Sequence, residues 1–160
     1  MIYQEKPILR SVFRAYDIRG LVETELDEAA YYTIGRALAV RLHALERDTI
    51  FIARDGRLTS EKLTRALAHG LIVSGIHVID LGMAATPVMY FATSTQGIDS
   101  GLMVTGSHNP ADYNGIKMVL AGKTSVQSDI DELYELVIRG QFHNGDGRLS
   151  IKNILPDYQD

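Results

Sequence analysis

The chain has no cysteine and no tryptophan among its 160 residues. Without cysteine it can form neither a disulfide framework nor a thiolate metal site, and this composition suits a reducing cytoplasm. It also lacks an excess of positive charge, since the formal net charge is -4 at pH 7 and no basic field gathers nucleic acid or an anionic membrane. No apolar run approaches the roughly 18 residues of a transmembrane helix, and the first residues lack the apolar core of a signal peptide. We therefore expect a soluble, cytoplasmic protein with no nucleic-acid partner and no membrane contact.

Hydrophobic residues make up 46% of the chain, and its length suits one compact core. Short β-branched and apolar runs predict buried strands at 49–53, 76–82, 101–104 and 115–121. A further strand-like piece opens the stretch 11–20 and runs into a charged loop. The predicted strands alternate with helical patterns along the chain.

Four helices are predicted, three of them from apolar residues at the three- and four-residue spacing of a helix. The first follows Asp27, a predicted N-cap, and the second is predicted to start at a Ser60 cap and to end at Gly75. Thr86 and Pro87 are the predicted N-cap and first residue of the third. The fourth ends at Gly140. The predicted apolar stripes are Tyr31, Ile34, Leu38 and Leu42, then Leu63, Leu67 and Leu71, and finally Val126, Ile130, Leu133 and Val137.

Strands separated by helices predict an α/β fold with a mixed, mostly parallel sheet between helices. The connection from 101–104 to 115–121 is too short for a crossover helix. The last of these strands is therefore predicted to run antiparallel to its neighbour. We expect a main domain at 1–140, and in 141–160 a turn, a strand and the start of a linker to a second domain. Asn144–Gly147 lacks the spaced acids of a calcium loop, so a hairpin turn is the favoured interpretation.

Ligands of an open α/β sheet bind beyond the carboxyl ends of its strands. The loops expected there bring several basic residues into a chain that is acidic overall. This favours an anionic ligand, with phosphate the leading candidate, although solvated loop arginines are an equal alternative. These residues are Arg14, Arg19, Arg54 and Arg57, with Lys117 farther along the chain.

The stretch VTGSHNPADYNGIK, 104–117, gathers more polar and reactive groups than a simple turn requires. Gly106 permits a sharp turn that holds Ser107 at the tip, where a serine is a nucleophile or a phosphate carrier if His108 or Lys117 activates it. Serine, asparagine, glycine and proline are also ordinary turn formers. The chain has no G-x-S-x-G, no P-loop, and no G-x-G-x-x-G after a strand. The other histidines lack partners at metal-ligand spacing and are interpreted as structural or surface residues: His43, His69, His77 and His143.

TGSHNP followed by YNGIK resembles the phosphoserine loop of the α-D-phosphohexomutase superfamily. FRAYDIRG and RDGR match the same family in order and spacing, and the likeness runs from about Ser11 to Tyr158. It is nearest to the bacterial phosphomannomutase/phosphoglucomutase branch. The resemblance implies an enzyme that interconverts hexose 1-phosphate and hexose 6-phosphate of mannose or glucose, through a bound 1,6-bisphosphate and a phosphoserine at Ser107.

The resemblance also implies residue roles. Ser107 carries the phosphoryl group and contributes to a Mg²⁺ site, His108 and Lys117 are candidates for proton transfer, and Arg19 holds charge. Tyr16, Arg19, Asn109 and Lys117 would contact the substrate. The chain matches only the first domain of that family and lacks its acidic metal loop, so we expect the isolated chain to be inactive and the Mg²⁺ site to be completed by other domains of a parent enzyme. The alternative is a non-catalytic phosphosugar-binding module.

Overall fold

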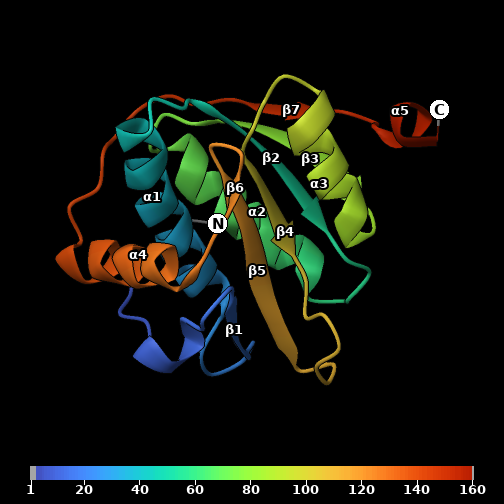
Figure 1. Ribbon diagram of the computed structural model, residues 1–160. Coiled ribbons are helices and arrows are strands. Elements are labelled where there is room, and N and C mark those ends of the chain that lie inside the picture. The colour runs from blue at the N-terminus through green and yellow to red at the C-terminus, as the bar shows by residue number, and fades with distance from the viewer. Residues whose placement is uncertain (1–2, 160) are drawn as a thin grey trace.

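The structure, a computed structural model, describes residues 3–159 as a sheet with helices on both faces (Figure 1). The strands are β1 (Ile18–Leu21), β2 (Thr49–Arg54), β3 (His77–Met83), β4 (Gly101–Val104), β5 (Tyr113–Leu120), β6 (Lys123–Thr124) and β7 (Leu149–Ile151). The helices are α1 (Glu28–Ala44), α2 (Ser60–Ile72), α3 (Thr86–Thr95), α4 (Gln127–Arg139) and α5 (Leu155–Gln159), with a 3-10 turn, η1, at Arg10–Val12. The predicted α/β fold is confirmed.

The sheet order is β1-β5-β4-β2-β3-β7, and β6 pairs with β5 outside this path. β4, β2, β3 and β7 pair in parallel, whereas β5 pairs antiparallel with β4, β1 and β6. Among the described strands only β5 therefore runs opposite to the rest, as predicted from the short connection between the strands at 101–104 and 115–121. The last strand in the chain, β7, is parallel to its neighbour β3.

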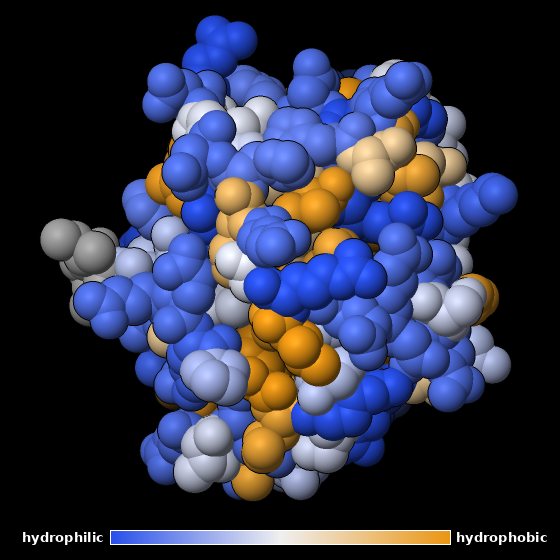
Figure 2. Space-filling model, turned by 90° about the vertical axis from the view of Figure 1, so that its left-hand side faces the viewer, coloured by the Kyte–Doolittle hydropathy of each residue, from blue (hydrophilic) through white to orange (hydrophobic). Residues whose placement is uncertain are grey.

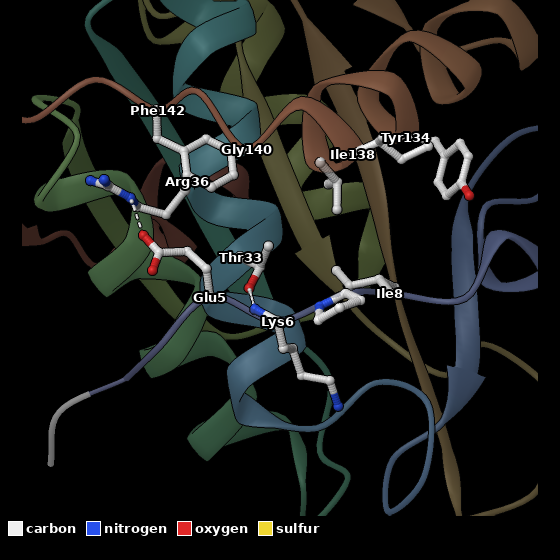
Figure 3. A pocket seen from close by; sticks show the side chains of 11 residues that line it. Glu5, Lys6, Ile8, Thr33, Arg36, Tyr134, Ile138, Gly140 and Phe142 are labelled. Atoms are coloured by element: carbon white, nitrogen blue, oxygen red, sulfur yellow. Dashed lines mark hydrogen bonds and ion pairs between the residues drawn. The ribbon is translucent and has the colours of Figure 1, made fainter.

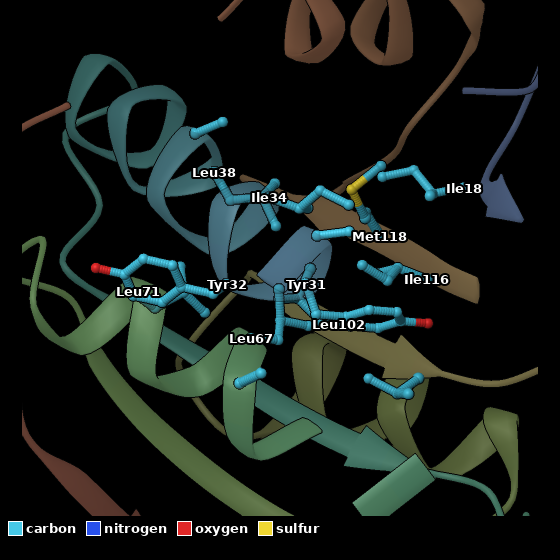
Figure 4. Packing of buried hydrophobic residues seen from close by; sticks show 14 of the residues in the cluster. Ile18, Tyr31, Tyr32, Ile34, Leu38, Leu67, Leu71, Leu102, Ile116 and Met118 are labelled. Carbon is cyan, nitrogen blue, oxygen red and sulfur yellow. The ribbon is translucent and has the colours of Figure 1, made fainter. Parts of the chain in front are cut away.

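Alternating strand residues bury against helices on opposite faces of the sheet, because successive side chains of a strand point to opposite sides. In β2, Ile50 and Ile52 join the core beneath α1, α2 and α4, whereas Phe51 and Ala53 join the smaller core beneath α3. Figure 4 shows the larger core. The predicted stripes of α1 and α2 are buried there, and in α4 the same holds for Ile130, Leu133 and Val137.

α1 and α2 pack unusually closely, because each contributes a glycine to the contact. A Cβ on Gly35 would lie 2.4 Å from the carbonyl oxygen of Leu67, and one on Gly70 would lie 2.3 Å from that of Tyr32. Only residues without a side chain allow the two backbones to approach this far. α1 is also bonded to the sheet, since the buried Tyr31 hydroxyl donates to the Gly115 carbonyl of β5 at 3.1 Å.

Several predicted element boundaries are wrong. The strand near the N-terminus does not precede the charged loop but follows it as β1, after η1. Asp27 does cap α1, accepting from the Ala30 N–H at 2.9 Å. The N-cap of α3 is Ala85 rather than Thr86, which is already helical. Val126 precedes α4 and is 49% exposed, so it lies outside the buried stripe.

The start and end of α2 also differ from the prediction. Its N-cap is Thr59, and Ser60 is the first helical residue, whose hydroxyl donates to Asp55 instead of capping the helix. The helix ends at Ile72, and Gly75, with φ 91°, makes the turn toward β3. The serine is thus used in a buried polar network rather than at a helix end.

The predicted hairpin turn at Asn144–Gly147 is wrong. This segment runs along the 72–76 backbone, with the Gly145 N–H donating to Val73 and the Gly147 N–H donating to Ile72. A Cβ on Gly147 would lie 2.0 Å from the Ile76 carbonyl oxygen, so the glycine serves a close backbone approach rather than a reversal. The chain then adds β7 to the sheet. Among the described residues, no helix is long and apolar enough to span a membrane.

Candidate active site

The carboxyl ends of β2, β3 and β4 meet at one edge of the sheet and frame a cavity of about 600 Å³. Its lining comes from the loops after β2 and β4, from the first residue of α3, which follows β3, and from side chains of β1 and β5. The lining residues are Arg19, Asp55, Thr86, Thr105, Ser107, His108, Asn109 and Lys117. Four residues with predicted catalytic roles, Arg19, Ser107, His108 and Lys117, therefore line a single cavity.

The strand register places Arg19 and Lys117 on the same face of the sheet. Arg19 pairs with Gly115 across β1 and β5, and Lys117 lies two residues beyond Gly115. Residues two apart in a strand share a face, so both cations project to the side of α3. Arg19 donates to the Asp17 carboxylate at 2.7 Å, whereas the Lys117 ammonium makes no hydrogen bond or ion pair with residues 3–159.

Ser107 has φ 53°, in the left-handed region that glycine tolerates and serine rarely adopts. Such strain costs on the order of 1–3 kcal/mol and persists where the surroundings enforce it, commonly at functional sites. The Ser107 N–H donates to the Thr105 hydroxyl at 3.0 Å. The Asn109 N–H and side-chain amide both donate to the Gly106 carbonyl, so Asn109, although it lines the cavity, also closes the loop on itself.

Asp55 accepts hydrogen bonds beneath this loop with both of its oxygens. Partial burial raises the pKa of Asp55, but hydrogen bonds from the Ser60 hydroxyl, the Arg57 N–H, the Thr105 hydroxyl and the Gly106 N–H together outweigh burial, so its pKa lies below the ordinary value. The buried Asn114 amide donates to Thr59 and Ser60, which extends the network to the start of α2. Asp55 and Thr105 were not predicted from the sequence, although Thr105 directly follows a predicted strand and Asp55 lies two residues beyond another.

The basic residues predicted near the ligand do not all converge. Arg54 lines a different cavity, with Asp80 and Glu61, and Arg14 is exposed. Arg57 lies beneath the loop, where its guanidinium donates to four backbone carbonyls. Tyr16 is 71% exposed and does not line the cavity. Arg19 belongs to β1 itself, not to a loop after a strand.

A second cavity, of about 620 Å³, lies between the N-terminal segment and α4 (Figure 3). The side of the molecule formed by α1 and α4 is mostly hydrophilic with apolar patches between (Figure 2). None of the predicted site residues lines this cavity. Arg36, which lines this cavity, is 7% exposed. Its guanidinium donates to the His143 carbonyl and to the Asn144 side chain, and so fixes the segment that follows α4. It also lies 3.3 Å from the carboxylate of Glu5.

Fold and cavity together define an α/β/α domain that presents a serine on a strained loop beside basic side chains. Residues 10–144 match the family described as phosphoglucomutase/phosphomannomutase, alpha/beta/alpha domain I. The chain belongs to this phosphoglucomutase/phosphomannomutase family, which confirms the resemblance drawn from its motifs.

Individual relatives agree with this assignment. The chain is 42% identical over 153 residues to the phosphomannomutase/phosphoglucomutase of Pseudomonas syringae pv. tomato, covering 95% of this chain and 33% of that protein. It is 43% identical over 153 residues to a phosphoglucomutase of Neisseria meningitidis, covering 94% and 33%. A crystal structure of a phosphoglucomutase/phosphomannomutase family protein from Burkholderia thailandensis matches with a TM-score of 0.91 and 42% identity, covering 94% of this chain and 35% of that one. The chain thus spans about a third of the length of the curated relatives it matches.

Proposed function

We propose that this chain is the phosphoserine-bearing first domain of a phosphohexomutase that interconverts hexose 1-phosphate and hexose 6-phosphate, of mannose or glucose. The relatives' names support the reaction. The main structural support for this site is the position of Ser107. It has φ 53° and lines a cavity that Arg19 and Lys117 also line.

In the proposed reaction, phosphoserine 107 donates its phosphoryl group to the free hydroxyl of the bound sugar phosphate. The bond from phosphorus to the serine oxygen breaks, and a bond from phosphorus to the sugar oxygen forms, giving the 1,6-bisphosphate. The sugar hydroxyl gives up its proton, and the serine oxygen gains one. The bisphosphate then reorients and returns its other phosphate to Ser107. Such transfer depends on positioning and charge stabilisation.

Each predicted residue has a place in this scheme. Lys117 and His108 are the candidates for moving the protons, and Arg19 stabilises charge on the transferring phosphoryl group. Asn109 and Tyr16 complete the proposed substrate contacts; Tyr16, on the exposed loop before β1, meets only a ligand that extends out of the cavity.

A Mg²⁺ ion would neutralise phosphate charge in this reaction, but the described part of the chain does not by itself fit one. No three His, Cys, Asp or Glu residues within 3–159 cluster to hold a metal. Asp55 already accepts hydrogen bonds on both oxygens, and the Ser107 hydroxyl is neutral. Mg²⁺ prefers several oxygen ligands, usually including carboxylates. We therefore propose that this chain contributes one phosphate oxygen at Ser107 and that the remaining domains of the parent enzyme contribute the carboxylates.

The test uses the parent enzyme with Ser107→Ala, assayed for glucose 6-phosphate formation from glucose 1-phosphate with glucose 1,6-bisphosphate and Mg²⁺. We expect turnover to be nearly abolished, because the phosphoryl carrier is gone, and Lys117→Ala to slow it markedly. Ser94→Ala, on the exposed face of α3, is the matched control and should keep wild-type turnover. Wild-type activity in Ser107→Ala contradicts the proposal. A wild-type parent that binds glucose 1-phosphate without converting it supports the binding module instead.

A further inference from the structure

Asp55 has no acceptor capacity left for a ligand. One carboxylate oxygen accepts from the Arg57 N–H at 3.1 Å and from the Ser60 hydroxyl at 2.5 Å. The other accepts from the Thr105 hydroxyl at 2.9 Å and the Gly106 N–H at 3.0 Å. A carboxylate offers about four lone-pair positions, so all of them are used inside the protein. Asp55 therefore acts on the loop after β4, not on a substrate.

Arg57 is saturated in the same way. One terminal nitrogen donates to the carbonyls of Pro110 and Tyr113, at 2.6 and 3.1 Å. The other donates to those of Ser107 and Asn109, at 3.1 and 2.7 Å. Its Nε lies 3.4 Å from the Asp55 carboxylate. The four N–H groups on the two terminal nitrogens are therefore all used within the protein, and the fifth, on Nε, faces Asp55. No terminal N–H remains for a phosphate.

Thr105 connects this pair to the Ser107 backbone. Its hydroxyl donates to Asp55 and accepts from the Ser107 N–H, so the carboxylate fixes the amide through one intervening hydroxyl. Arg57 fixes the other side of the same residue through the Ser107 carbonyl. Both backbone groups of Ser107 are therefore held, and its left-handed conformation, which is unfavourable for a serine, is enforced from two sides.

We propose that Asp55, Arg57 and Thr105, here called the loop clamp, are positioning residues for phosphoryl transfer, which they support by holding Ser107 in place rather than by hydrogen-bonding to the substrate. This rests on the proposed function of Ser107. The clamp matters for rate rather than for binding, because a displacement of about 1 Å in the reacting group reduces transfer by as much as a hundredfold.

Thr105→Val and Thr105→Ser test the clamp. Valine keeps the shape of the buried threonine but removes the hydroxyl, whereas serine keeps the hydroxyl. In the 160-residue chain, we expect hydrogen exchange of the Ser107 amide to become about tenfold faster in Thr105→Val, equivalent to about one lost hydrogen bond, and to stay near wild type in Thr105→Ser. In the parent enzyme, Thr105→Val should lower kcat by roughly 10- to 100-fold and leave KM within about threefold, and Thr105→Ser should restore kcat.

Thr95→Val is the matched control, since Thr95 is exposed on α3 and its hydroxyl bonds only to the Phe91 carbonyl and to the neighbouring Gln96 side chain within residues 3–159. It should change neither measurement. If Thr105→Val leaves both the exchange rate of the Ser107 amide and kcat unchanged, the loop clamp proposal is wrong. It is also wrong if Thr105→Val and Thr105→Ser lower kcat equally, because that result reflects packing at position 105 and not the hydroxyl. A parent enzyme that turns over without phosphate on Ser107 overturns the proposed function instead, and the exchange rates of the chain still report on the clamp.

Discussion

Gly106→Ala tests whether the Arg57 guanidinium excludes any side chain from position 106, in the loop that carries Ser107. A Cβ at position 106 would lie 2.2 Å from the guanidinium carbon of Arg57, far inside van der Waals contact. The guanidinium cannot move aside freely, because it donates to four carbonyls of the loop. Overpacking costs about 1–3 kcal/mol, and each displaced hydrogen bond adds about 1 kcal/mol.

We expect Gly106→Ala to lower the free energy of unfolding by about 3 kcal/mol. In a domain of this size, that corresponds to a fall in Tm of roughly 6–12 °C. In an Arg57→Ala background the obstructing group is absent, so adding Gly106→Ala should cost less than about 0.5 kcal/mol. Urea unfolding of the four proteins of this double-mutant cycle measures the coupling.

Gly56→Ala is the control, because its Cβ would meet only the Met83 sulfur at an ordinary 3.6 Å. It should leave stability within about 0.5 kcal/mol. Additive losses from Gly106→Ala and Arg57→Ala would refute the reasoning, since they would show that the alanine is unfavourable for a reason other than contact with the guanidinium.

Two further changes test the core and the charge of the network. Gly35→Ala should destabilise the chain by at least about 2 kcal/mol in thermal unfolding, because the added Cβ meets the backbone carbonyl of Leu67 and forces α1 and α2 apart. A loss of stability no larger than that of Gly56→Ala contradicts this expectation. The lowered pKa of Asp55 means that its contribution is present above the unfolded pKa, near 4, and disappears as pH falls through the folded pKa. The stability difference between wild type and Asp55→Asn should therefore be largest near pH 7 and shrink below about pH 4, and a difference that is constant with pH in urea unfolding rules the explanation out.

Much of the fold was predictable because it depends on local periodicity. The spacing of Tyr31, Ile34, Leu38 and Leu42 predicts one buried face of α1, and all four are buried. The short connection between the predicted strands at 101–104 and 115–121 predicts the antiparallel β5, which the structure confirms. The motif around Ser107 identifies the family, because its residues are adjacent in sequence. Arg19, Ser107, His108 and Lys117 do line one cavity, while their catalytic roles stay predictions.

Two of the errors occur where a distant part of the chain supplies a contact. Ser60 resembles a helix cap, but the carboxylate of Asp55 and the amide of Asn114 engage its hydroxyl. The glycines at 145 and 147 resemble a turn, but they fit against the backbone before β3. The division at residue 140 into a main domain and a linker start stays a prediction, although β7 joins the same sheet.

Arg57 shows most clearly what the sequence determined and what it did not. The sequence alone determined the α/β class, the strand and helix periods, and the serine loop, because hydrophobic spacing and turn chemistry act between near neighbours. It also indicated that a basic residue follows β2. Only the tertiary structure decided that this arginine lies beneath the loop with both terminal nitrogens bonded to loop carbonyls, whereas Arg19 and Lys117 face the cavity. Hydrogen-bond saturation depends on which distant carbonyls surround a side chain, and folding alone brings those carbonyls together.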